Sequence, residues 1–223
     1  MSEAPAIRDI PDFVRNSVNL ASAGLGAKAL FATDDFFAEV GRMLADRPAV
    51  FVPDKYDDNG KWMDGWESRR KRTAGHDHAV VRLATPGVIR GFDIDTSHFT
   101  GNYPPAARIE ACNVREDPGD GTAWTEILPL TPLGPSAHHY LASESTDVWS
   151  HVRLHIYPDG GVARLRAFGE PHLDVNSLRG KTIDLASGLN GGRVVAYSDA
   201  HYGAFHRLLA PGRSPAARCS PVG

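Results

Sequence analysis

Glycine and proline interrupt this chain so often that few segments are long enough for an extended helix. The 223 residues include 22 glycines and 16 prolines, and the runs between them are mostly short. Several of these runs alternate apolar and polar residues, which is the period of a strand with one face in a core. Short alternating runs between turn residues are typical of an all-β sandwich or barrel. We therefore predict a two-sheet β-sandwich with little helix.

The clearest alternation lies in residues 151–157, where valine, leucine and isoleucine side chains share one face. The sequence Pro-Asp-Gly-Gly at residues 158–161 then predicts a tight turn. Residues 162–168 alternate again. Together the three segments predict a β-hairpin.

A second pair of strands is predicted earlier in the chain. The sequence predicts a strand at residues 79–83 and a turn at residues 85–87, and residues 88–95 alternate. In the last run Asp93 and Asp95 fall on the face opposite the apolar side chains. Arginine interrupts the apolar face near the start of that run.

One short helix is predicted in the first third of the chain. Apolar residues recur at helical spacing within residues 34–45. Thr33 or Asp34 is a suitable N-cap, because either side chain accepts a hydrogen bond from an amide of the first turn. We expect this helix to be a minor part of the fold.

Composition excludes several classes of function. The chain has 24 basic and 27 acidic residues, so it lacks the basic balance expected of a protein that binds nucleic acid. No run approaches 18 apolar residues, and the first residues lack the pattern of a signal peptide. Cys112 and Cys219 lie too far apart for a disulfide framework. We expect a cytoplasmic protein that does not bind membranes.

A weak internal repeat is visible in the sequence. Residues 24–44 align without gaps on residues 188–208, and Asp35 matches Asp199. The second copy then ends, because residues 214–223 show no periodicity and resemble a disordered tail.

Three ordered segments resemble the allantoicase repeat. The first is residues 57–70, with Met-Asp-Gly-Trp-Glu at its centre, and the second is Gly-His-Asp at residues 75–77. The third is residues 91–105, which contain Asp-Thr-Ser-His-Phe-Thr-Gly-Asn. The resemblance continues through residues 157–161 and 189–213. Allantoicases are known for two similar jelly-roll domains of the galactose-binding type, and they convert allantoate and water to ureidoglycolate and urea.

This resemblance implies a division of the chain. Residues 1–172 correspond to a complete first repeat, residues 173–213 to the start of a second, and residues 214–223 to a tail. Second copies of the Gly-Trp-Glu and Gly-His-Asp segments are expected after residue 213 and are absent, so the chain resembles a truncated one. We expect homo-oligomers, because a missing domain would leave a partner surface exposed.

The reaction that the resemblance implies needs an acid, a base and a carboxylate clamp. Urea is a poor leaving group, so its nitrogen must be protonated by a general acid. A base must remove a proton from the other ureido group or from water. The carboxylate of allantoate suits an arginine fork, which binds it through two hydrogen bonds.

Polar residues of the three segments supply the candidates for these roles. The candidates for acid–base work are His76, Asp77, Glu67, Asp95 and His98. The candidates for substrate binding are Arg69, Arg70, Asn102, Thr100 and Trp66. Each has a structural alternative. The histidines can be ordinary loop residues, the carboxylates can form turns or be solvated, the basic run can be solvated, and the tryptophan can pack in the loop. Asp93, in the third of these segments, has the alternative of a solvated carboxylate on the outer face of a sheet.

Two further questions stay open in the sequence. His76, Asp77, Asp95 and His98 can in principle supply ligands to a divalent ion such as Mn²⁺, but no metal-binding spacing on one element requires it. The alternative to an allantoate hydrolase is a non-catalytic jelly-roll module or inactive fragment that binds ureides or sugars. A third possibility is a sister activity on ureidoglycolate. Jelly rolls serve many functions, so the fold does not decide.

Overall fold

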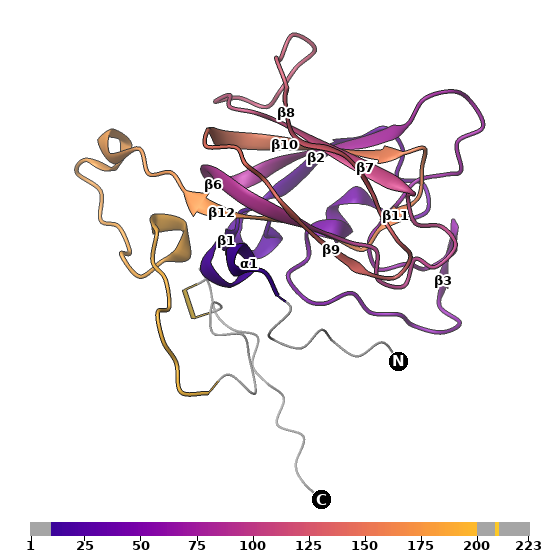
Figure 1. Cartoon of the computed structure of the whole chain (residues 1–223), viewed down its shortest axis with the longest axis horizontal. Coiled ribbons are helices and arrows are strands. Elements are labelled where there is room, and N and C mark those ends of the chain that lie inside the picture. Colours follow the sequence, from indigo (N-terminus) through magenta and orange to yellow (C-terminus); the bar gives the residue numbers. More distant parts are fainter. Residues whose placement is uncertain (1–9, 200–207, 210–223) are drawn as a thin grey trace, which may run out of the picture.

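The computed structural model describes residues 10–199 and 208–209, and within them the protein is an antiparallel β structure (Figure 1). Eight strands form one hydrogen-bonded sheet: β1 (Val18–Asn19), β2 (Lys28–Ala32), β6 (Asp77–Asp95), β7 (Ala106–Cys112), β8 (Thr125–Pro132), β9 (His138–Ala142), β10 (Val148–Tyr157) and β12 (Arg164–Pro171). Two small strand pairs lie outside it: β3 (Tyr56–Asp57) with β4 (Gly60–Lys61), and β5 (Trp66–Glu67) with β11 (Gly161–Val162).

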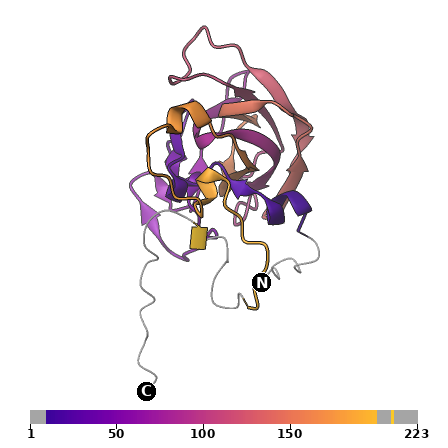
Figure 2. The ribbon, with the colours of Figure 1, turned by 90° about the vertical axis from the view of Figure 1, so that its left-hand side faces the viewer.

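Helical segments are short (Figures 1 and 2). They are α1 (Asp12–Asn16) and the 3₁₀ helices η2 (Ala23–Leu25), η3 (Val40–Leu44), η4 (Val175–Leu178) and η5 (Gly188–Asn190). Within the described residues, none of them has the length and apolar character needed to cross a membrane. The predicted tail at residues 214–223, with Cys219, lies outside the described residues.

Strand β6 builds both layers of the sandwich. Residues 77–82 pair with β10 on one edge, and residues 79–82 pair with β2 on the other. Residues 87 and 88 still pair with β10, but residues 87–95 pair with β12 on the other edge, and residues 91–95 pair with β9. The first half of β6 therefore belongs to the layer β2-β6-β10-β7-β8, and the second half belongs to the layer with β9, β12 and β1. A strand that passes between two sheets makes the corner of a sandwich.

The turn predicted at residues 85–87 is wrong, because this segment is the continuous middle of β6. Pro86 lacks an amide proton, so a proline fits in a strand only where no ladder bond is lost. That condition holds here because β6 changes partners at this point. The Pro86 carbonyl still accepts a hydrogen bond of 2.8 Å from the amide of His172.

The predicted hairpin is also wrong in its pairing. Strands β10 and β12 cover the predicted segments, but each pairs with β6 and they do not pair with each other. Residues 158–161 therefore connect the two layers of the sandwich. The alternation was sufficient to predict the buried face of each strand, since Val152, Leu154 and Ile156 are fully buried.

The predicted helix over residues 34–45 is reduced to the five residues of η3. Its N-cap is Glu39, not Thr33 or Asp34. Both predicted caps have other partners: the Thr33 hydroxyl donates to Asp77, and the Asp34 carboxylate binds Arg69. The apolar residues Val40, Met43 and Leu44 are buried, as their spacing predicts.

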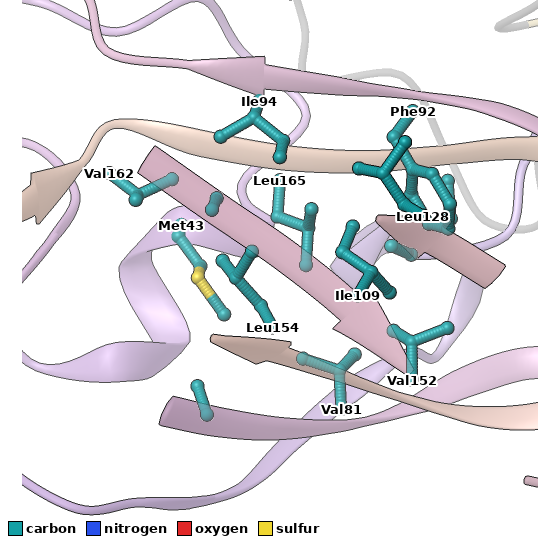
Figure 3. Packing of buried hydrophobic residues seen from close by; sticks show 14 of the residues in the cluster. Met43, Val81, Phe92, Ile94, Ile109, Leu128, Val152, Leu154, Val162 and Leu165 are labelled. Carbon is teal, nitrogen blue, oxygen red and sulfur yellow. The ribbon is translucent and has the colours of Figure 1, made fainter. Parts of the chain in front are cut away.

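One hydrophobic core fills the space between the two layers (Figure 3). Fully or almost fully buried side chains come from both: Val81, Ile109, Val152 and Leu154 from the first layer, and Phe92, Ile94 and Leu165 from the second. Burying one such side chain contributes roughly 1.5–3 kcal/mol. The core thus fixes the two layers and the loops that join them. The predicted all-β sandwich is confirmed.

A register shift in β6 explains the arginine that interrupts its apolar face. Phe168 of β12 pairs with Gly91, while Gly169 pairs with Ile89, so Arg90 is left without a pairing partner in β12. An extra residue of this kind is a β-bulge. Because of the bulge, the odd-numbered Ile89 and the even-numbered Phe92 and Ile94 all face the same core.

Candidate functional site

The sequence segments with the most polar residues meet around the loop at residues 157–161. Three backbone hydrogen bonds connect them to this loop: Asp77 N to Pro158 O (3.1 Å), Ser68 N to Gly160 O (3.2 Å) and Gly161 N to Asn102 O (2.7 Å). A fourth joins Ala163 N, just after the loop, to Asp95 O (2.8 Å). Both ends of β6, the end of β10 and the start of β12 lie here. Residues far apart in the sequence therefore share one end of the sandwich.

Two glycines make this convergence possible. Gly160 has φ of +136°, and a Cβ there would lie 2.7–2.8 Å from the backbone of residues 102–104. A Cβ on Gly161 would lie within 2.1 Å of two ring carbons of Phe99, which is fully buried. Only glycine allows so close an approach of two loops. The loop at 157–161 and the segment at 99–104 are thus held against each other by packing.

A cavity of about 350 Å³ opens beside these loops. Its lining comes from the first and third signature segments and from two neighbouring loops: Phe51, Lys61, Met63, His98, Thr100, Asn102 and Ser136. Pockets for small ligands have volumes of about 300–1,000 Å³ and combine apolar walls with a few polar groups. The Lys61 ammonium lies 4.6 Å from the centre of the Phe51 ring, so a positive charge stands at the wall.

Glu67 lies next to this cavity and is almost fully buried. Its Oε1 accepts a hydrogen bond of 2.6 Å from Nδ2 of Asn102, a residue of the cavity wall. Burial raises the pKa of Glu67, and the hydrogen bond from Asn102 opposes this only in part. Within the described residues, Asn102 is the only hydrogen-bond partner of this carboxyl group. A carboxyl group of this kind suits proton donation.

His98 is held in an uncommon backbone conformation at the cavity wall. Its φ is +70°, in the left-handed region that non-glycine residues rarely adopt. Its amide donates to Ser136 Oγ (3.2 Å), and its Nε2 lies 3.2 Å from the carbonyl of Ala49. Backbone strain of this kind costs about 1–3 kcal/mol and often occurs at binding sites.

A second polar cluster contacts the same loop through Asp77. Its members are His76, Asp77, His78, Glu110, His155 and Tyr157. The Asp77 carboxylate is buried; its Oδ1 accepts from Lys71 Nζ (2.6 Å) and Thr33 Oγ1 (2.8 Å). The second oxygen of Asp77 has no partner in the described part of the chain.

The buried histidine of this cluster makes stability depend on pH. Burial lowers the pKa of His155 to about 4, although the Glu110 carboxylate acts to raise it. Unfolded histidine has a pKa of about 6.5, so only the unfolded chain takes up this proton as pH falls. The contribution of His155 is fully present above about pH 6.5, and about 3 kcal/mol is lost as pH falls towards 4.

We therefore expect His155→Gln to reduce the loss of unfolding free energy between about pH 7 and about pH 4.5. Urea denaturation at both pH values measures this difference. The exposed His172 offers a matched control, since His172→Gln should leave the wild-type difference unchanged. Equal acid sensitivity in His155→Gln and wild type would contradict the assignment.

The family of the chain follows from comparison with known proteins. The model of the allantoicase repeat matches residues 18–172, well over half of the chain. The chain belongs to the allantoicase family.

Individual allantoicases agree with this assignment. A probable allantoicase of Rhizobium meliloti (strain 1021) is 61% identical over 204 residues, and probable allantoicase 1 of Burkholderia mallei (strain ATCC 23344) is 56% identical over 205. These matches cover 92% and 91% of this chain but only 60% and 61% of the relatives. The chain thus spans about three fifths of their length.

The fold agrees as well. A solved allantoicase structure superposes with a TM-score of 0.80 at 29% identity, covering 94% of this chain and 66% of that one. The crystal structure of allantoicase from Saccharomyces cerevisiae gives 0.79 at 28% identity, with the same coverage. The predicted all-β jelly-roll sandwich is confirmed.

Four of the predicted site residues gather at the cavity of this allantoicase repeat. His98, Thr100 and Asn102 line it, and Glu67 contacts Asn102. His76 and Asp77 are outside its lining and belong to the second cluster.

The remaining predicted residues also lie outside the cavity lining. Trp66 is fully buried, and its Nε1 donates to the Asp34 carbonyl (2.8 Å). Arg69 pairs with the Asp34 carboxylate (2.7 Å), while Arg70 is exposed and outside the cavity lining. Asp95 is buried and accepts from the amide of Ser97 (2.8 Å), which fixes the start of the loop at 96–103.

Asp93 is buried as well, so the alternative of a solvated carboxylate is wrong for it. It pairs with Arg166 Nη1 (2.9 Å) and with Nδ1 of His138 (3.0 Å), a histidine to which the sequence assigned no role. The Asp95 carboxylate lies farther from both groups, at 3.7 and 3.9 Å. These contacts connect β6, β9 and β12 outside the core.

The suggested set of metal ligands is not assembled. Among the described residues, no group of three or more His, Cys, Asp or Glu side chains is arranged to hold a metal ion. Asp95 is engaged by Ser97 and His98 faces the cavity, while His76 and Asp77 lie in the other cluster. The four residues therefore do not converge on one point.

Sequence reasoning missed several residues of the cavity wall and of the second polar cluster. Lys61 lies in the first signature segment but resembles an ordinary solvated lysine. Phe51 and Ser136 belong to loops without any motif. His155 was visible on the polar face of residues 151–157, yet only the fold places it beside Glu110 of β7.

Proposed function

We propose that this chain carries an allantoate-hydrolysing site, formed by the cavity and Glu67. The observation that supports it most directly is a buried carboxyl group with a raised pKa beside a small cavity with polar groups in its wall, in a member of the allantoicase family. A protonated carboxyl group at this position supplies the acid that a urea leaving group requires. The name of the relatives supplies the substrate class.

The proposed reaction assigns a role to each group. Glu67 gives its proton to the ureido nitrogen that leaves, and the bond from the central carbon to that nitrogen breaks. A base removes a proton from the second ureido group, so that a carbon–nitrogen double bond forms. Water then adds to the central carbon, while the base returns its proton to the ureido nitrogen and the Glu67 carboxylate takes the proton that the water loses. The sum is allantoate plus water to ureidoglycolate plus urea. Asn102 holds the Glu67 carboxyl group in place through its 2.6 Å hydrogen bond.

Substrate binding is assigned to the cavity wall. The Lys61 ammonium suits the carboxylate of allantoate, in place of the arginines predicted from the sequence. His98, Thr100 and Ser136 offer hydrogen-bonding groups of fixed position to ureido carbonyl and amide groups.

Urea release from allantoate by the purified chain tests the proposal. Calorimetric titration with allantoate in parallel separates turnover from binding. Turnover supports the hydrolase. Heat of binding without urea would instead support the alternative, a ligand-binding jelly-roll module. A folded chain that does neither would overturn both readings.

We also propose that residues 173–213 begin a second allantoicase repeat. The match to the repeat model ends at residue 172, and the 3₁₀ helices η2 and η5 are both capped by a left-handed glycine, Gly26 and Gly191. Residues 194–195, which align with part of β2, are not in a strand. Apolar side chains are exposed in this part, including Val175, Leu185 and Val195, which supports contact with a further domain or subunit. Light scattering by the purified chain tests for homo-oligomers.

A further inference from the structure

Three side chains from separate elements form a continuous hydrogen-bonded chain outside the cavity. Oε2 of Glu110, on β7, lies 2.8 Å from Nε2 of His155, on β10. Nδ1 of His155 lies 2.8 Å from Nε2 of His76, which directly precedes β6. Each histidine contact uses a different ring nitrogen. The protonation state of Glu110 therefore determines which atom donates in each of these hydrogen bonds.

Glu110 is the anionic end of this chain. Burial would raise its pKa, but the hydrogen bonds from Arg153 and His155 outweigh burial and lower the pKa below its ordinary value. Arg153 Nε donates to its Oε2 (2.9 Å), and Arg108 Nη2 lies 3.2 Å from its Oε1. An ionised carboxylate can only accept hydrogen bonds.

The two histidines then follow in order. Nε2 of His155 must carry the proton that it donates to Glu110, and burial keeps the ring neutral, because the pKa of His155 is lowered to about 4. Its Nδ1 is therefore an acceptor, and Nε2 of His76 donates to it. Burial and the positive charge of Arg108 lower the pKa of His76, so this ring is also neutral. Its Nδ1 is left with a lone pair.

The surroundings leave only the outer end of the chain open. His155 is 6% exposed, whereas His76 is partly exposed and stacks on the Tyr157 ring at 4.2 Å between centres. The ionisable groups that surround the two rings are Lys71, Asp77, His78, Arg108, Glu110, Arg153 and Tyr157. A proton can reach the chain from solvent or a ligand at His76.

We propose that Glu110 and His155 are positioning residues for His76, and that they fix the tautomer whose Nδ1 accepts a proton from the second ureido group of the substrate. This inference rests on the proposed function. Allantoate has two ureido arms on one carbon, so its acid and its base must approach different arms. Glu67 and His76 lie at the same end of the sandwich, because their neighbours Ser68 and Asp77 bond to the same loop, at Gly160 and Pro158. His76 lies outside the lining of the cavity, so the proposal requires the second ureido arm to extend past this loop to His76.

The proton balance is simple. The ureido N–H proton moves to Nδ1 of His76, and the nitrogen's electron pair forms the carbon–nitrogen double bond while urea leaves with the proton of Glu67. The resulting imidazolium of His76 donates to His155, whose other nitrogen donates to the Glu110 anion. The negative charge at the far end of the chain thus stabilises the positive charge that develops.

The first test is nitrogen NMR of the imidazole rings, which reports tautomers without any activity. At about pH 7 we expect both His76 and His155 as the neutral form protonated at Nε2, with signals assigned by His76→Gln and His155→Gln. In Glu110→Gln the carboxylate acceptor is lost, and the tautomer of His155 should no longer be uniform. A wild-type His76 protonated at Nδ1 would overturn the proposal.

The second test is kinetic, with a matched control. Glu110→Gln should lower kcat for urea release on the order of 100-fold and leave KM nearly unchanged, since it misplaces the base without touching the cavity. It should also shift the acidic limb of the pH profile. Glu126 contacts the same Arg108 (3.5 Å) but neither histidine, so Glu126→Gln should behave as wild type.

The outcomes of the two tests are separable. Equal kcat in Glu110→Gln, His155→Gln and Glu126→Gln would overturn the positioning role even if the wild type is active. If the wild-type chain releases no urea, the proposed function fails by itself. The tautomer of His76 then still decides whether Glu110 and His155 orient it as the structure indicates.

Discussion

Replacing Glu67 by glutamine is expected to lower the rate of urea release from allantoate by about 100- to 10,000-fold, the usual contribution of a general acid. Glutamine keeps the shape of the side chain and can keep a hydrogen bond to Asn102, which lies 2.6 Å from the carboxyl group. It cannot donate a proton to the leaving nitrogen. The change should therefore appear in kcat, with KM nearly unchanged, because the cavity lining is preserved.

The pH profile gives this prediction a sign. A general acid acts in its protonated form, so activity should fall as pH rises through the pKa of Glu67. Burial raises that pKa, which moves the fall to higher pH than for an ordinary glutamate. This limb should vanish in Glu67→Gln. The exposed Glu144 permits the same chemical change as a control, and Glu144→Gln should keep both rate and profile. Loss of activity in both variants, or in neither, would remove Glu67 from the mechanism.

The strands of the fold were predictable because burial depends on a local pattern. The alternation in residues 151–157 correctly predicts which side chains of β10 are buried. The strands that pair with β10 were not predictable in this way. Strand pairing depends on contacts over long sequence distances, and β10 and β12 both pair with β6. Pro86 and Gly87 normally indicate a turn, but here they lie where one strand passes between two layers.

The site was predictable only where its residues share a sequence segment. His98, Thr100 and Asn102 lie within five positions, and the fold keeps them together at the cavity. Glu67 joins them because β5 pairs with β11, whose Gly161 amide donates to the Asn102 carbonyl, and because the Asn102 side chain donates to Glu67. By contrast, Glu110 lies in β7, a segment without a motif. Its contact with His155 depends on the register of β7 against β10, which no local pattern reveals.

Breaking the buried ion pair of Asp64 and Arg164 should have the largest effect on stability. Arg164 is fully buried, Asp64 nearly so, and Nη2 of Arg164 lies 2.8 Å from Oδ2 of Asp64. Removing one partner leaves an uncompensated charge in the interior, which typically costs about 3–5 kcal/mol. We expect Asp64→Asn to lower the free energy of unfolding by this amount, as measured by urea denaturation. The exposed pair of Asp12 and Arg15 is the control, because Asp12→Asn should cost less than about 1 kcal/mol.

Replacing both partners by apolar residues should not restore stability here, although it often does for buried ion pairs. The Arg164 guanidinium also donates to main-chain carbonyls from three segments, at Arg47 (2.9 Å), Asp64 (2.8 Å) and Ala163 (2.6 Å). In the double variant Asp64→Leu/Arg164→Met these acceptors would lose their donor, at about 1–3 kcal/mol for each that stays buried. Recovery of wild-type stability in the double variant would contradict this account. Asp64 lies three positions before Glu67, so one short segment of the repeat supplies both an anchor for the fold and the proposed acid.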